Sequence, residues 1–139
     1  MKKFAWLLTF VIALSLVLSA CGAGATPTAA PVEKFRVAVV MPSSITDLAF
    51  SQSMYDALIR IQKDMGGPDK FEIVYSEGMF VVDDAAAAIR DYASKGYNLV
   101  IAHGSQYGSS LQEIAPDFPE TSFAWGTTVD TFGQPNIFA

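Results

Sequence analysis

The sequence predicts an α/β protein with a doubly wound parallel sheet, and three observations lead to this class. Short apolar runs rich in β-branched residues, typical of buried parallel strands, alternate along the chain with segments of helical periodicity. Stretches that contain Gly and Pro separate these segments. Repeated strand–helix units form a parallel sheet covered on both faces, and right-handed crossovers favour the strand order 2-1-3-4-5.

The elements follow one another regularly from residue 35 onward. The predicted strands are residues 35–41, 71–75, 99–102, 121–125 and the start of a fifth at 137–139. The predicted helices are residues 47–65, 84–95 and 108–115. Gly66-Gly67-Pro68 is expected to end the first helix. Asp83 is the predicted N-cap of the second helix, and Gly96 its C-terminal stop.

The N-terminus has the pattern of a bacterial lipoprotein signal. Two lysines precede the apolar run 4–18, which is shorter than the ~20 residues that a membrane span needs. Leu18-Ser19-Ala20-Cys21 resembles a lipobox, in which the chain is cut before the cysteine and the thiol is acylated. An ordinary signal peptide followed by a free cysteine is the alternative. We predict a signal peptide at 1–20 and a lipid anchor on Cys21 at the extracytoplasmic face of the cell membrane.

The remainder divides into a tether and one domain. Residues 21–33 are rich in Ala, Gly, Pro and Thr, which predicts a flexible tether, and residues 34–139 form the domain. Removal of residues 1–20 leaves seven basic and fourteen acidic residues, a net charge of −7. An acidic chain without a basic stripe argues against nucleic acid as a partner.

The predicted strand order singles out two loops as the ligand site. In the order 2-1-3-4-5 the winding reverses between strands 1 and 3, and ligands bind beside the carboxyl ends of the strands at such a point. The loops are residues 41–50 and 103–108. In the first, Asp47 either caps the helix or accepts hydrogen bonds from a ligand, and the two roles are compatible. Phe50 either packs in the core or stacks on a planar ligand.

The second loop has one glycine on each side of Tyr107, and these two glycines would let the backbone approach a ligand closely. Tyr107 is either a ring that closes on the ligand opposite Phe50 or a plain loop tyrosine. His103, the single histidine, is expected to be a hydrogen-bonded structural residue. We expect no metal or cofactor, since a second histidine is lacking. We also expect no catalysis, because the chain has no Gly-x-Ser-x-Gly elbow.

Four segments of the chain together carry a family pattern: Val37-Ala38-Val39-Val40, Thr46-Asp47-Leu48-Ala49-Phe50-Ser51-Gln52, Ile101-Ala102-His103-Gly104-Ser105-Gln106-Tyr107-Gly108 and Phe118-Pro119-Glu120-Thr121-Ser122-Phe123. With these segments the chain resembles the basic membrane protein (BMP) family of substrate-binding lipoproteins of ABC importers. The resemblance implies a type I periplasmic-binding-protein fold that delivers a small ligand to an ABC permease. Combined with the loop topology, it gives these candidate ligand-binding residues: Asp47, Phe50, Ser51, Gln52, Gly104 and Tyr107.

The chain departs from the family pattern at Ser51, where the family commonly has an asparagine whose amide contacts the base in nucleoside-binding members. A hydroxyl cannot supply an amide's paired donor and acceptor. A purine nucleoside is therefore a ligand suggested by the resemblance and not carried over from it. The family has two lobes, so residues 34–139 are expected to form the N-terminal lobe only. The alternative function is a surface lipoprotein that acts as a sensor or adhesive module.

Lipidation can be tested directly. Cells fed a labelled fatty-acid analogue should incorporate the label into the wild-type chain and not into Cys21→Ser, because the acyl groups attach through that cysteine. One acyl chain anchors a protein only marginally, so at least two are expected, and the variant should move to the soluble fraction. Equal labelling of the two proteins would show that Cys21 is not the modified residue.

Overall fold

The computed structural model describes residues 33–139 of the chain. The predicted signal peptide, the lipidation site Cys21 and all of the tether except Glu33 lie outside the described residues. Within residues 33–139, none of the helices has the length and apolar character needed to cross a membrane.

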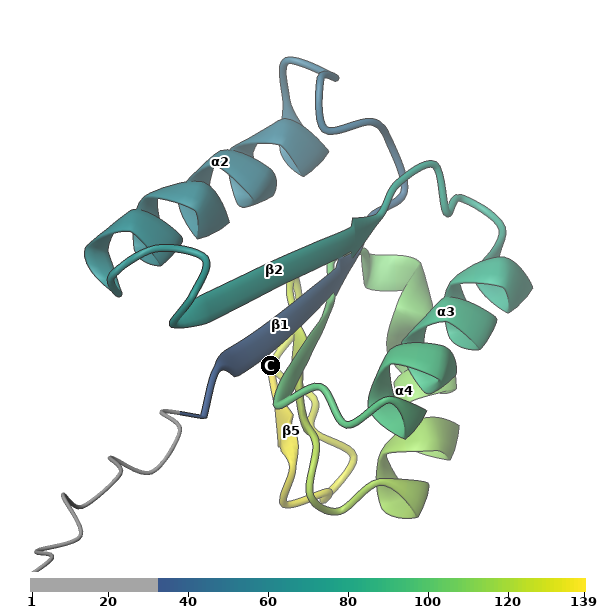
Figure 1. Ribbon diagram of the computed structural model, residues 1–139. Coiled ribbons are helices and arrows are strands. Elements are labelled where there is room, and N and C mark those ends of the chain that lie inside the picture. The colour runs from purple at the N-terminus through teal and green to yellow at the C-terminus, as the bar shows by residue number, and fades with distance from the viewer. Residues whose placement is uncertain (1–32) are drawn as a thin grey trace, which may run out of the picture. The chain divides into compact units, whose positions relative to one another are not determined.

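The described residues form a five-stranded parallel sheet with helices on both faces (Figure 1). The strands are β1 (Phe35–Val40), β2 (Phe71–Ser76), β3 (Leu99–Ala102), β4 (Ser122–Trp125) and β5 (Ile137–Phe138). The α-helices are α2 (Phe50–Asp64), α3 (Val82–Ser94) and α4 (Gly108–Ile114), with 3₁₀ turns η2 (Ser105–Tyr107) and η3 (Ala115–Asp117). The order β2-β1-β3-β4-β5 and the parallel pairing confirm the predicted fold class and topology.

The central strand β1 separates two apolar clusters. Val37 and Val39 face α2, where Leu58 packs against them, whereas Ala38 and Val40 face the side covered by α3 and α4. All four strand residues are fully buried. This explains why β1 reads as a continuous apolar run, since a parallel strand covered on both faces has no solvent side.

The helix ends differ from the predictions in two places. The first helix begins at Phe50 and not at Asp47, because Leu48 adopts a left-handed backbone conformation (φ 57°) that interrupts the helix. The predicted cap at Asp83 is wrong: α3 begins at Val82 after an extended Val81, and Asp83 lies in the first turn, where its charge complements the helix dipole. The stop at Gly96 (φ 73°) is confirmed.

Asn136 fastens the connection between β4 and β5. Its side-chain amide lies within hydrogen-bond distance of three backbone carbonyls, those of Ala115 (3.0 Å), Phe118 (3.0 Å) and Thr121 (3.1 Å). The connection has no helix of its own, so these contacts replace the packing that would normally return the chain to the start of the next strand. The Asn136 side chain thus fixes the chain directly before β5.

The sheet assignment predicts that a charge is not tolerated in β3. Val100→Asp should remove the cooperative unfolding transition seen by circular dichroism, because Val100 is fully buried and an unpaired buried carboxylate costs several kcal/mol. Val129→Asp is the matched control, since Val129 is 94% exposed. Normal folding of Val100→Asp would mean that β3 does not lie inside the sheet.

Candidate functional site

Three loops that follow parallel strands are tied together at the carboxyl edge of the sheet. After β1 and β2, the Met79 amide donates to the Met41 carbonyl (2.9 Å) and the Ile45 amide donates to the Glu77 carboxylate (2.7 Å). After β3, the Tyr107 hydroxyl reaches the Met79 carbonyl (2.7 Å). Hydrogen bonds between the three loops therefore hold together the edge at which the strand order predicts a ligand.

Asp47 organises the loop after β1. One carboxylate oxygen accepts from the Ala49 amide (2.8 Å) and the Gln52 amide (3.1 Å), and the other from the Ser51 amide (3.1 Å) and the Ser43 hydroxyl. The Ser43 hydrogen bond and the three backbone N–H bonds hold the pKa of Asp47 well below its usual range. Asp47 thus caps α2, as one of the two open interpretations predicted.

These four bonds limit what Asp47 offers a ligand. A carboxylate has about four lone-pair positions, and the chain's own donors fill that number. Two other candidate residues are engaged in the same loop. Ser51 is fully buried, with its hydroxyl oxygen 2.8 Å from that of Ser43. The Gln52 side-chain oxygen accepts from the Leu48 amide (2.9 Å), so the NH₂ group of Gln52 remains for a ligand.

Phe50 forms an aromatic platform with His103. Their ring centroids lie 3.8 Å apart at an interplanar angle of 14°, and Phe50 is 41% exposed while His103 is only 7% exposed. His103 Nε2 lies 3.0 Å from the Phe50 carbonyl oxygen, which can only accept, so Nε2 carries the proton. His103 is a hydrogen-bonded structural residue, as predicted. It supports one side of the Phe50 ring, and the exposed part of that ring is available to a planar ligand.

Tyr107 lies where the sequence did not place it. The loop after β3 continues into the 3₁₀ turn η2, which directs the Tyr107 ring into the core, where it is fully buried. Burial raises the pKa of its phenol to about 12. The expectation of a ring face open to a ligand is corrected accordingly. Gly104 is needed for this arrangement, because a Cβ there would lie 2.6 Å from the Tyr107 ring.

Trp125, at the end of β4, is a contributor that sequence reasoning missed. Its indole N–H donates to the Gly104 carbonyl (3.0 Å), and its ring lies so close to Gly108 that a Cβ there would be 2.3 Å away. The two glycines of this loop are thus required by close approach of the chain's own aromatic rings. The only signal in the sequence was the pairing of loop glycines with a tryptophan at a strand end.

The basic residues of the domain are confined to one of its two edges. The loops at the carboxyl edge, residues 41–49, 77–81, 103–107 and 126–136, contain no Lys or Arg. All seven basic residues beyond position 20 lie just before or at the start of β1, before β2, in the second halves of α2 and α3, or directly after α3. Among residues 33–139, no three His, Cys, Asp or Glu side chains are grouped to hold a metal ion.

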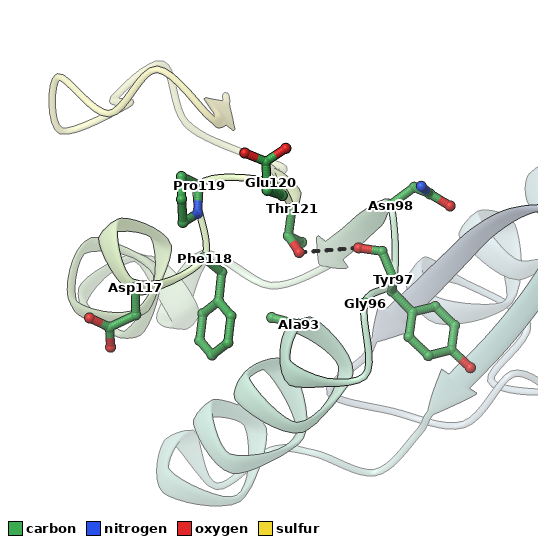
Figure 2. Close-up of a pocket in the computed structure, with 9 residues that line it drawn as sticks. All are labelled: Ala93, Gly96, Tyr97, Asn98, Asp117, Phe118, Pro119, Glu120 and Thr121. Carbon is green, nitrogen blue, oxygen red and sulfur yellow. Dashed lines mark hydrogen bonds between the residues drawn. The ribbon is translucent and has the colours of Figure 1, made fainter.

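A hollow of about 440 Å³ lies at the opposite edge, beside the amino ends of β3 and β4 (Figure 2). The side chain of Phe118 and the Thr121 hydroxyl line it, and that hydroxyl donates to the Tyr97 carbonyl (3.2 Å). Asp117 on its rim is paired with Arg90 (2.7 Å), and the Tyr97 ring turns away from the hollow. The polar side chains around the hollow do not point toward a common centre. The hollow therefore has the size of a ligand site but lacks the convergent polar groups that bind a ligand.

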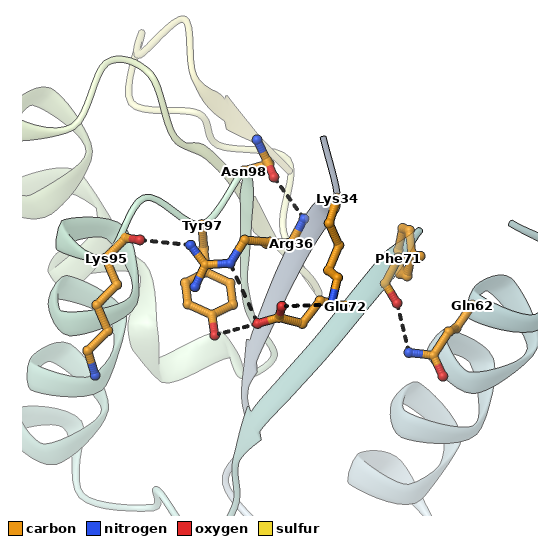
Figure 3. A network of polar contacts seen from close by, with 8 residues as sticks. All are labelled: Lys34, Arg36, Gln62, Phe71, Glu72, Lys95, Tyr97 and Asn98. Atoms are coloured by element: carbon orange, nitrogen blue, oxygen red, sulfur yellow. Dashed lines mark hydrogen bonds and ion pairs between the residues drawn. The ribbon is translucent and has the colours of Figure 1, made fainter. Parts of the chain in front are cut away.

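Beside this hollow, Arg36 of β1 contacts both the neighbouring strand β2 and the turn after α3 (Figure 3). Its guanidinium lies 4.0 Å from the centroid of the Tyr97 ring and 3.5 Å from the Glu72 carboxylate. It also donates to the Lys95 carbonyl (2.9 Å), while the Tyr97 hydroxyl donates to Glu72 (3.2 Å). These side chains bind one another and link β1, β2 and the turn after α3. The amino edge is therefore occupied by structural contacts.

The buried histidine predicts a pH dependence of stability. Burial lowers the pKa of His103 below its ordinary 6.5, although the Phe50 carbonyl and the Asp47 charge oppose this. As the pH falls through 6.5, the unfolded chain gains a proton that the folded chain does not, so the folded state loses stability. The urea midpoint of the wild type should fall between about pH 7.5 and 5.5. His103→Gln keeps a donor for the carbonyl and should lose this decrease; an equal decrease in both proteins would exclude His103 as its cause.

Comparison with known proteins agrees with this architecture. The chain is 31% identical over 116 residues to "Transcriptional activator protein med" of Bacillus subtilis (strain 168), covering 84% of this chain and 34% of that protein. Two solved ABC transporter solute-binding proteins have the same fold. The one from Conexibacter woesei DSM 14684 has a TM-score of 0.61 and 24% identity, over 73% of this chain and 33% of that one. The one from Aeropyrum pernix K1 has a TM-score of 0.61 and 19% identity, over 73% and 26%.

The chain thus spans about a quarter to a third of the length of these relatives. The family described as "ABC transporter substrate-binding protein PnrA-like" (Bmp) matches residues 34–131, which is most of the described domain. This match confirms the resemblance noted in the four sequence segments. The chain belongs to the Bmp family of PnrA-like ABC transporter substrate-binding proteins.

Proposed function

We propose that this chain contributes to the binding of a small, uncharged ligand with a planar ring and to its delivery to an ABC permease. The observation that carries the proposal is the Phe50 ring, partly exposed at the carboxyl edge and supported from behind by His103 at 3.8 Å. Membership of the Bmp family supports the role in substrate binding. The lipobox at Leu18-Ser19-Ala20-Cys21 supports a location at the extracytoplasmic face of the membrane.

The charge distribution favours an uncharged ligand. An anionic group such as a phosphate is usually bound by Arg, Lys or free backbone N–H groups, and the carboxyl-edge loops have no basic residue. The N–H groups of Ser51 and Gln52 in the first turn of α2, and that of Ala49 just before it, are already occupied by Asp47. Asp47, Glu77 and Asp130 are the acidic residues in these loops, and they would repel an anion. A purine nucleoside meets these conditions, whereas its monophosphate does not.

Each candidate residue has a distinct part in this proposal. Phe50 stacks on the ring of the ligand, and the NH₂ group of Gln52 donates to it. Asp47 and Ser51 hold the loop that presents these two side chains. Gly104 lets the second loop pack against Tyr107, which fixes that loop from the inside.

Titration of the chain with inosine and with inosine 5′-monophosphate tests the proposal. The titrations are followed by the amide chemical shifts of the chain, purified in mild detergent. The Kd of inosine should be at least roughly tenfold lower than that of the monophosphate, a ratio that corresponds to about 1.4 kcal/mol. Phe50→Ala should weaken inosine binding roughly tenfold, because stacking on one ring contributes ~1–3 kcal/mol. Phe50→Tyr keeps a ring and should bind as the wild type does.

Two results would contradict different parts of the proposal. Unchanged affinity in Phe50→Ala, with an intact fold by circular dichroism, would place the site elsewhere on the chain. Absence of binding by inosine, adenosine and guanosine would exclude purine nucleosides as the ligand class.

A sensor role without transport is the second candidate. It is favoured by the relative named "Transcriptional activator protein med", which matches 84% of this chain. The net charge of −7 beyond residue 20 argues against direct contact with DNA, so such a role would act through ligand binding at the membrane. Uptake of labelled inosine by cells lacking the gene separates the two: reduced uptake supports import, and unchanged uptake supports a sensor.

A further inference from the structure

Phe80 is a large apolar side chain left open to solvent at the same edge as Phe50. It lies between β2 and α3 and is 77% exposed, and it belongs to neither apolar cluster of the domain. Its neighbour Val81 is also exposed, as is Leu48 in the loop after β1. Single exposed apolar residues are common, but several exposed apolar side chains on adjoining loops are typical of a surface that binds a ligand or another protein.

The loop that carries Phe80 is firmly held, so this exposure does not arise from a loosely attached segment. Next to Phe80, the Met79 amide donates to the Met41 carbonyl (2.9 Å), and the Met79 carbonyl accepts from the Tyr107 hydroxyl (2.7 Å). The Gly78 amide donates to the Ser43 carbonyl (3.4 Å). The backbone on the N-terminal side of Phe80 is thus bonded to both loops of the candidate site.

We infer that Phe80 is a second aromatic contact of the ligand site, in the role that the sequence assigned to Tyr107. This inference rests on the proposed function and extends it. Tyr107 is buried beneath the loop, and its hydroxyl bonds to the residue directly before Phe80. The buried tyrosine therefore positions an exposed phenylalanine. A ligand that contacts both Phe50 and Phe80 has apolar surface in addition to the ring stacked on Phe50.

Three variants of the chain, purified in mild detergent, test this role with inosine and guanosine as probes and amide chemical shifts as the readout. Phe80→Ala should weaken binding about fivefold or more, the lower end of what a base–aromatic contact contributes. Phe80→Leu keeps apolar volume without a ring and should fall between wild type and Phe80→Ala. Met65→Ala is the matched control, because Met65 is 55% exposed at the far end of α2, and it should bind as the wild type does.

The melting temperature of Phe80→Ala should equal that of the wild type, since an exposed ring contributes little to the core. The inference is overturned if Phe80→Ala binds as tightly as Met65→Ala while Phe50→Ala binds weakly, for then the site lacks Phe80. It is also overturned if Phe80→Ala changes the oligomeric state and not the affinity, which would make this surface a contact between proteins. If the wild type binds neither probe, the proposed nucleoside ligand fails and this inference fails with it.

Discussion

The Asp47 carboxylate is the contact on which the carboxyl edge of this domain depends. It accepts hydrogen bonds from the Ser43 hydroxyl and from the N–H groups of Ala49, Ser51 and Gln52, and so fixes both the path of the loop and the start of the helix. Phe50 is the first residue of that helix, so its ring is placed by the same contact. As a result, all of the carboxylate's hydrogen-bonding positions are used by donors of the chain itself. In the proposed site, recognition of a ligand would therefore depend on rings and amide groups.

Buried aromatic side chains give the edge its rigidity. Tyr107 joins the loop after β3 to the loop after β2, and Trp125 joins it to β4. Both rings require a glycine next to them, Gly104 for Tyr107 and Gly108 for Trp125. A hydrogen bond from a buried phenol or indole satisfies a carbonyl that would otherwise be costly to bury, so each contact both fills space and fixes a loop. The surface residues of these loops are consequently held in place before any ligand arrives.

Much of the fold could be predicted from local pattern, because the central strands β1 and β3 are buried on both faces and read as continuous apolar runs. The strand order followed from connection rules, and the stop at Gly96 from the need for a left-handed residue. The side on which a loop residue lies could not be predicted in this way. Tyr107 turns inward because the loop winds into a 3₁₀ turn, and Asn136 reaches three carbonyls from distant segments. Such placements depend on tertiary packing, which leaves no periodic trace in the sequence.

The absence of basic residues from the carboxyl-edge loops restricts the ligands that the proposed site could bind more than any single residue does. Parallel strands and the helices that return between them run in opposite directions, so the second halves of α2 and α3 lie at the amino edge with the start of β1. Every basic residue of the domain is found in or near these segments, and Arg36 and Arg90 are held there by Glu72 and Asp117. The loops at the edge that carries Phe50 therefore contain no lysine or arginine. A ligand that brings a negative charge would find no basic side chain in these loops and would be repelled by Asp47, Glu77 and Asp130, whereas a neutral ring would not be repelled.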